Sequence, residues 1–315
     1  MKLKFLLIFV LGMAVALSGC VQQHQKPSGK PQVITTLFPL YDFARTIAGT
    51  KADVRLLLPP GVEAHNFEPR PDDIVTINKA QIFIYTNRYM EPWAAKILSA
   101  INPKKLQVVD AGEGVKYLKV ENGAEHEHDP GHQTGQGSVD PHIWLDFDNS
   151  QIIVRNILAG FVADDPPNAD YYRSNAAALS EKLTDLDRRY RIGLASCSTR
   201  VLLHGGHFTF GYLARRYELD YRALSGVSSE SEPSAIQMAD MAKTIKKRGV
   251  HYLFTEELLS PRLAETLAAE TGVGILKLHG AHNVSKEDLQ HGVTFIDLME
   301  LNLKNLQKGL ACREK

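Results

Sequence analysis

The sequence predicts an α/β fold with two lobes, each built on a mainly parallel sheet, and one long helix that joins them. Its 315 residues are long for a single domain and fit two. In both halves, short apolar runs alternate with helical patterns, which is typical of parallel sheets. Between the halves, residues 168–193 keep a helical pattern without an internal breaker.

In the first half of the chain, glycine and proline residues mark the ends of the expected helices and strands. A glycine ends the first helix, and Pro59, Pro60 and Gly61 stop the second strand. Asp72 and Asp73 suit the positive end of the next helix. The expected strands cover residues 32–37, 54–58, 81–85 and 107–109, and the expected helices cover residues 41–48, 71–79, 91–100 and 150–163. We therefore assign residues 32–166 to an N-terminal α/β lobe.

The pattern of strands and helices then repeats. Expected strands cover residues 200–203, 221–224, 252–255 and 274–278, and expected helices cover residues 208–217, 234–248, 260–271 and 295–310. We assign residues 167–195 to a linking helix and residues 196–315 to a C-terminal α/β lobe. The linking helix carries one apolar stripe, Leu179, Leu183, Leu186 and Tyr190, and measures ~39 Å at the usual rise per residue.

The first 31 residues read as a targeting segment. Lys2 and Lys4 precede an apolar run that is too short to span a bilayer, and the sequence LSGC at residues 17–20 is similar to a bacterial lipobox. We therefore expect a signal peptide over residues 1–20, a lipid on Cys20 and a flexible tether over residues 21–31. An ordinary signal peptide with an incidental cysteine is the alternative. Either signal predicts an extracytoplasmic protein, and the lipid would anchor it to the membrane.

Charge and cysteine content narrow the function classes. The formal net charge is zero and no basic stripe is present, so nucleic acid is not an expected partner. Cys197 and Cys312 would lie in an oxidising compartment. They form either a disulfide or two buried thiols, because spacing along the chain does not say whether their Cα atoms come close enough.

Residues 125–137 form a loop rich in histidines and acids with almost no apolar side chains, so it cannot build a core. Imidazoles and carboxylates are the groups that bind divalent metals. The sequence DPHIWLD at residues 140–146 follows. Its apolar residues Trp144 and Leu145 indicate that the chain is again part of a hydrophobic core. His142 therefore stands where a metal-attracting loop meets the folded domain.

Four histidines are candidate metal ligands because each lies near the carboxyl end of an expected strand or in this central motif. They are His65, His142, His207 and His279. Open α/β sheets place ligand sites at these strand ends, and two histidines come from each half. A lone histidine in such a place is more often a surface or packing residue, but four suggest convergence. Four neutral imidazoles suit tetrahedral Zn²⁺ and leave no open position for a catalytic water.

Common catalytic motifs are missing from the sequence. It contains no His-Glu-x-x-His, no Gly-x-Ser-x-Gly, no P-loop and no Gly-x-Gly-x-x-Gly. The sequence HGGH at residues 204–207 has no serine elbow to accompany it. We therefore expect metal binding or transport without enzymatic turnover.

Together these motifs resemble the metal-binding lipoproteins of bacterial ABC importers, the zinc and manganese cluster of periplasmic solute-binding proteins. The resemblance covers residues 32–310. It rests on GVEAHNFEP at residues 61–69, DPHIWLD at 140–146, HFTFGY at 207–212, EPS at 232–234, SPRLAETL at 260–267 and ETG at 270–272. It implies two Rossmann-like lobes joined by a long rigid helix, with metal in the cleft, and it assigns His65, His142 and His207 as ligands.

Two positions depart from the family pattern or compete with the assigned ligands. The fourth family ligand is often an acid, whereas this chain has LHGAHN at residues 278–283. We predict His279 as the fourth ligand, with His282 close enough to compete. His204 could be mistaken for His207, but the spacing to the aromatic-Gly-Tyr sequence favours His207.

The sequence thus predicts a monomeric, lipid-anchored protein that binds Zn²⁺ and delivers it to an ABC transporter permease. Carriage of Mn²⁺ or Fe²⁺ by the same transporter class is one alternative, although carboxylate and water ligands would suit Mn²⁺ better. A surface adhesion protein with a structural metal is another, and a zinc hydrolase is a third.

Overall fold

The computed structural model describes residues 29–100, 106–120, 138–227, 233–258 and 260–313. The fold is that of the compact unit Pro31–Lys315. Cys20, the expected signal peptide over residues 1–20 and the histidine-rich residues 125–137 lie outside the described residues. No helix within the described ranges is long and apolar enough to cross a membrane.

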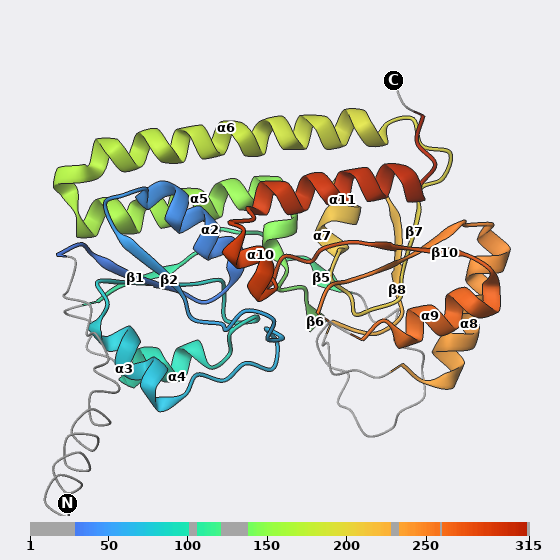
Figure 1. The fold of residues 1–315 in the computed structure, drawn as a ribbon, viewed down its shortest axis with the longest axis horizontal. Helices are drawn as coiled ribbons and strands as arrows, with labels where there is room; N and C mark the ends of the chain where they lie inside the picture. The colour runs from blue at the N-terminus through green and yellow to red at the C-terminus, as the bar shows by residue number, and fades with distance from the viewer. Residues whose placement is uncertain (1–28, 101–105, 121–137, 228–232, 259, 314–315) are drawn as a thin grey trace, which may run out of the picture. The chain divides into compact units, whose positions relative to one another are not determined.

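The N-terminal lobe is a parallel sheet with a helical layer on each face. Its strands run in the order β2-β1-β3-β4, with bounds β1 Gln32–Thr35, β2 Asp53–Leu56, β3 Ile82–Tyr85 and β4 Gln107–Asp110. Helices α2 (Phe38–Ala48) and α5 (Phe147–Asp164) cover one face, and α3 (Pro71–Lys79) and α4 (Ala94–Ala100) cover the other (Figure 1). Ile77 of α3 and Ile97 of α4 pack on Phe83 of β3, which explains this second layer.

The C-terminal lobe repeats this arrangement. Its parallel strands run in the order β10-β9-β7-β8, with bounds β7 Val201–His204, β8 Asp220–Ala223, β9 Tyr252–Thr255 and β10 Gly274–Lys277. Its helices are α7 (Gly211–Arg216), α8 (Ala235–Arg248), α9 (Arg262–Thr271), α10 (Lys286–Gln290) and α11 (Phe295–Gly309). The predicted α/β class with two parallel sheets is confirmed. Two short antiparallel strands, β5 (Lys119–Val120) and β6 (Ser138–Val139), were not predicted.

Helix α6 (Ala169–Leu194) is the predicted linking helix, preceded by the short 3-10 turn η2 (Pro166–Asn168). It extends along both lobes, beside α5 and α11 (Figure 1). The whole predicted stripe, Leu179, Leu183, Leu186 and Tyr190, is buried. The Tyr190 hydroxyl donates a hydrogen bond to the Met299 carbonyl of α11 at 2.6 Å, so the helix is fastened to the second lobe as well as packed on the first.

The last part of the chain contacts the first lobe before it returns to the second. Arg45 of α2 donates to the Val293 carbonyl at 2.9 Å, and Phe295 N donates to Asp42 Oδ2 at 2.8 Å. The rings of Phe43 and Phe295 meet edge to face. Residues at both ends of the segment 282–295 therefore contact the first lobe, although the sequence suggested that everything after residue 195 belongs to the second lobe.

The structure pairs Cys197 with Cys312 in a disulfide, which decides a question that the sequence left open. The bridge joins the segment before β7 to the end of α11. Ser198 N also donates to the Ala311 carbonyl at 3.2 Å, so the two chain segments are hydrogen-bonded as well as cross-linked.

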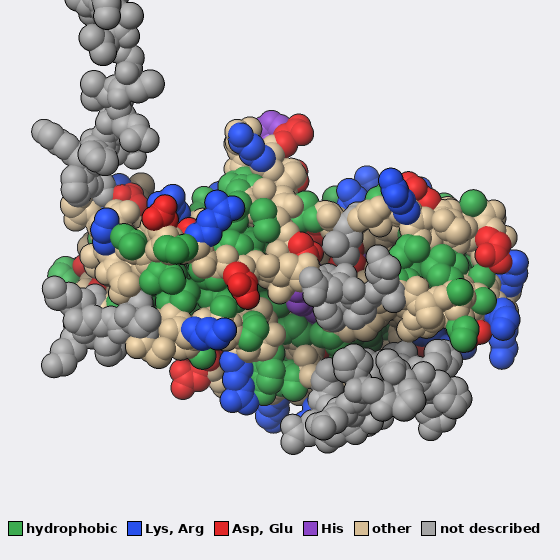
Figure 2. All heavy atoms as spheres, turned by 90° about the horizontal axis from the view of Figure 1, so that it is seen from below, with side chains coloured by type: hydrophobic (Ala, Val, Ile, Leu, Met, Phe, Trp, Pro, Cys, Tyr) green, Lys and Arg blue, Asp and Glu red, His purple; other side chains and the backbone are tan. Residues whose placement is uncertain are grey.

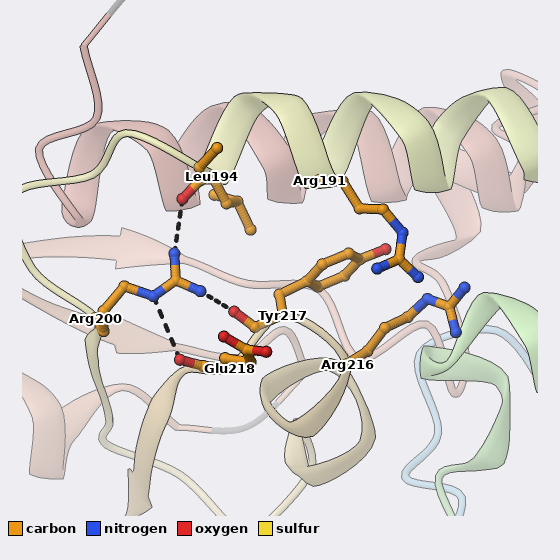
Figure 3. A pocket seen from close by; sticks show the side chains of 7 residues that line it. Arg191, Leu194, Arg200, Arg216, Tyr217 and Glu218 are labelled. Carbon is orange, nitrogen blue, oxygen red and sulfur yellow. Dashed lines mark hydrogen bonds between the residues drawn. The ribbon is translucent and has the colours of Figure 1, made fainter.

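Charged side chains of both signs are interspersed over the described part of the face in Figure 2, in keeping with the zero net charge. Near the end of α6, a pocket of about 230 Å³ is lined by arginines (Figure 3). Arg200 donates to the carbonyls of Leu194, Tyr217 and Glu218. Arg216 pairs with Asp146, Asp148 and Asp187, and Arg191 also pairs with Asp187. These arginines connect α6, α7 and the start of α5 through ion pairs and hydrogen bonds. The residues around the pocket therefore stabilise the packing of these elements.

Candidate metal centre

Four histidines from distant parts of the chain meet at one point. His65, His142, His207 and His282 each offer one ring nitrogen, and these four atoms all lie within 4.8 Å of one another. His142 is central, because its Nε2 lies 3.2 Å from His65 Nε2 and 3.4 Å from His207 Nε2. His65 is half-buried and the other three are buried. Such close approach of four ring nitrogens is a geometry that can hold a cation.

The parallel sheets explain why these residues converge. His65 lies in the loop after β2, and His142 directly precedes the 3-10 turn η1 (Ile143–Leu145). His207 follows β7, and His282 follows β10. Three of the four therefore come from segments that leave the carboxyl ends of parallel strands, which share one edge of each sheet.

The structure brings His282, and not the predicted His279, into this group. The backbone of His279 is held by Asn302 of α11, whose Oδ1 accepts from His279 N at 2.7 Å and whose Nδ2 donates to His279 O at 2.8 Å. His279 Nδ1 lies 2.9 Å from Ala281 N and 3.0 Å from Glu257 Oε1. His279 is thus fastened to its own lobe and to a carboxylate.

A turn of the chain at Ala281 places His282 in the group instead of His279. Ala281 has φ of 60°, in the left-handed region that non-glycine residues seldom adopt. The turn points His282 toward His65 and His142, with ring centroids 5.4 and 4.8 Å away. Within the described residues, His282 Nε2 is buried and has no hydrogen-bond partner, so no other group of the protein occupies this nitrogen.

His207 and His204 are separated as the sequence motif indicated. His207 is in the group, whereas the His204 ring packs edge-on against Phe210 with centroids 5.0 Å apart. His204 Nδ1 lies 3.0 Å from the His207 carbonyl oxygen and supports the backbone of its neighbour.

Carboxylates behind the histidines orient the rings. Asp140 Oδ1 lies 2.7 Å from His142 Nδ1, and Glu256 Oε2 lies 2.8 Å from His207 Nδ1. With Nδ1 engaged in this way, Nε2 is the nitrogen that faces the metal position. Glu257 Oε1 lies 3.9 Å from His282 Nδ1, a weaker contact.

Sequence reasoning missed Glu256 and Glu257 as supporting groups. Both follow β9 directly and are buried, with exposed fractions of 8% and 9%. Two acids immediately after a strand, at the same sheet edge as the histidines, were the available signal.

Burial controls the protonation of the cluster. Desolvation, assisted by the nearby imidazoles, lowers the pKa of His65 to about 2 and holds the pKa of His142 well below its usual range. Burial also opposes the charged form of His282, but the Glu257 carboxylate and the charge of Glu63 outweigh it and raise the pKa of that ring. His65 and His142 are therefore neutral imidazoles at neutral pH, the form in which a histidine can bind a metal.

We expect the Glu256→Gln variant to bind zinc about 10- to 100-fold more weakly, because loss of a carboxylate that orients a ligand histidine typically has this effect. Glutamine keeps the size of the side chain but removes the negative charge that faces His207 Nδ1. Chelator competition would measure the change, with the exposed Glu287→Gln as the matched control. Equal affinity of both variants and the wild type would show that Glu256 does not support the site.

Two α/β lobes joined by a long helix, with a group of four histidines, are the architecture of the metal-type solute-binding proteins. The chain belongs to the family of the periplasmic zinc-uptake complex component A, ZnuA, whose sequence model matches residues 33–309. This confirms the resemblance that the motifs suggested.

Similar proteins include two with zinc in their names. The high-affinity zinc uptake system protein ZnuA of Bacillus subtilis is 34% identical over 305 residues, which cover 96% of this chain and 94% of that protein. The zinc-binding lipoprotein AdcA of Streptococcus pneumoniae is 34% identical over 97% of this chain. This chain spans 60% of the length of AdcA.

Solved structures agree with the fold. The metal-dependent lipoprotein YcdH of Bacillus subtilis superposes with a TM-score of 0.77 at 34% identity, over 89% of this chain and 100% of that one. The Zn(II)-bound ZnuA-like domain of Streptococcus pneumoniae AdcA gives a TM-score of 0.76 at 34% identity, over 90% of this chain and 99% of that domain.

Proposed function

We propose that this protein binds Zn²⁺ reversibly outside the cytoplasm and delivers it to the permease of an ABC importer. The observation that carries the proposal is the group of four imidazoles whose nitrogens lie within 4.8 Å of one another between the two lobes. Membership of the zinc-uptake family and the names of its relatives support zinc as the cargo.

The proposed ligands are His65, His142, His207 and His282. His282 takes the place for which the sequence suggested His279, because His282 has the free, inward-facing nitrogen. A shell of four imidazoles carries no negative charge to compensate the metal ion, and imidazoles suit Zn²⁺ better than Mn²⁺ or Fe²⁺, which favour carboxylates and water. The nearby carboxylates Asp140 and Glu256 are already engaged by histidines.

The proposal includes no catalysis. A tetrahedral shell of four protein nitrogens saturates Zn²⁺ and leaves no position for a substrate or an activated water. Release of the metal then requires movement of protein ligands, which suits a monomeric carrier that hands its cargo to a membrane partner.

The decisive experiment combines metal analysis with two single substitutions. Protein purified without added metal is expected to carry one zinc per chain. In chelator competition, His282→Ala should weaken zinc binding by at least about tenfold, or ~1.4 kcal/mol, whereas His279→Ala should have a much smaller effect. A larger loss in His279→Ala would restore that residue as the ligand, and a protein that prefers Mn²⁺ over Zn²⁺ would contradict the cargo.

The membrane anchor is a further part of the proposal. The LSGC sequence suggests that the mature protein begins at a lipid-modified Cys20. We expect Cys20→Ala protein to be released into the soluble fraction or to stay unprocessed, as judged by fractionation and N-terminal sequencing. Normal cleavage and membrane retention of this variant would exclude lipid anchoring at that cysteine.

A further inference from the structure

The loop that carries His282 leaves the second lobe and is hydrogen-bonded to the first. Phe38 N, at the start of α2, donates to the His282 carbonyl at 3.1 Å. Gly61 N donates to the Val284 carbonyl at 2.9 Å. The backbone on both sides of Asn283 is therefore paired with backbone of the N-terminal lobe.

The side chain of Asn283 completes this attachment. It is fully buried, and its Nδ2 donates to the carbonyls of Pro59 at 2.7 Å and Val62 at 2.9 Å. Its Oδ1 accepts from Val284 N at 2.9 Å. Pro59 and Val62 begin the loop that leads to His65, so one carboxamide joins the loops of two candidate ligands.

The preceding half of the loop is anchored on the other lobe. Glu257 accepts hydrogen bonds from Gly280 N at 2.7 Å and from Ala281 N at 3.1 Å, and Asn302 holds His279. The residues before His282 are thus hydrogen-bonded to the second lobe, and the chain from the His282 carbonyl onward is hydrogen-bonded to the first. The contacts that join this segment to the loop of His65 come from Asn283 and Val284, which follow the turn at Ala281.

We propose that Asn283 is a positioning residue of the metal site, which locks the loops of His65 and His282 into one preformed unit. The inference rests on the proposed zinc function, because it assumes that both histidines bind the metal. Asn283 itself is not in the group of four donors and acts through the placement of its neighbour. Without its carboxamide, the two loops lose the hydrogen bonds to the carbonyls of Pro59 and Val62 and are held together more weakly.

A double-mutant cycle separates this role from general support of the fold. Asn283→Ala is expected to weaken zinc binding by about tenfold or more, the usual effect of removing an outer partner of a metal ligand. The same loss should appear in a His207→Ala background, because His207 lies outside the two loops that Asn283 joins. In a His282→Ala background, most of the effect should disappear.

Asn305→Ala is the matched control, since Asn305 also donates from its side chain to a backbone carbonyl, that of Lys277, at 2.8 Å. It should leave zinc affinity unchanged. Wild-type affinity of Asn283→Ala, or an equal loss in the His207→Ala and His282→Ala backgrounds, would overturn the proposal.

A measurement on the wild-type protein covers the case in which Asn283→Ala does not fold. If the unit is preformed, the amides of Phe38 and Gly61 exchange with solvent equally slowly in the metal-free and zinc-loaded protein. Protection of these amides that appears only with zinc would overturn the proposal. A wild-type protein that binds no zinc would instead contradict the proposed function, and the exchange of these two amides would still show whether the loops are joined.

Discussion

The His142→Ala variant is expected to lose tight zinc binding, with the affinity falling by roughly a thousandfold, ~4 kcal/mol. His142 is fully buried and is the central member of the group, with close nitrogen contacts to both His65 and His207. Its removal deletes one ligand and also leaves the buried carboxylate of Asp140 without its imidazole partner. Competition against a chelator of known affinity would measure the loss.

His251→Ala is the appropriate control, because His251 is exposed and lies outside the group. It should bind one zinc with the wild-type affinity. If His142→Ala retains one tight zinc, the four-histidine site is not the cargo site, and the histidine-rich segment over residues 125–137 becomes the place to search.

The second large effect is expected from the disulfide. Replacing Cys197 and Cys312 together by serine should lower the free energy of unfolding by roughly 3–5 kcal/mol, because the bridge closes a long loop and restricts the unfolded chain. The two cysteines are 115 residues apart in sequence, so the restricted loop is most of the C-terminal half. Denaturant unfolding under non-reducing conditions would measure the difference.

Zinc affinity of the double variant should stay close to that of the wild type, since neither cysteine belongs to the group of metal donors. Reduction of the wild type should reproduce the lower stability. Equal unfolding midpoints of wild type and variant, with equal slopes, would show that the bridge contributes little.

Much of the architecture could be predicted from the sequence because it depends on local patterns. The alternation of strand and helix patterns and the apolar stripe on α6 record which residues face a core, and the structure buries that stripe. The rule that ligands gather at the carboxyl ends of parallel strands pointed to His65 and His207, and the DPHIWLD motif pointed to His142. These three meet in the structure.

One boundary was misplaced although its cause is local: Asp146 caps Asp148 N, so α5 begins at Phe147, earlier than the helical pattern alone suggested.

Contacts between distant segments could not be predicted from local patterns. The backbone of Val293 and Phe295 bonds to the side chains of Arg45 and Asp42 of α2, and these partners are about 250 residues away in sequence.

By itself, the sequence determined the two α/β lobes, the linking helix, the family and three of the four histidines that come together. Only the tertiary structure showed that His282, and not His279, joins the other three histidines, because both residues follow the same strand and their spacing to it does not distinguish them. The left-handed turn at Ala281 and the anchoring of His279 by Asn302 separate them. The same holds for the pairing of Cys197 with Cys312 and for the carboxylate of Glu256 behind His207, since each depends on a distance across the fold that no local pattern encodes.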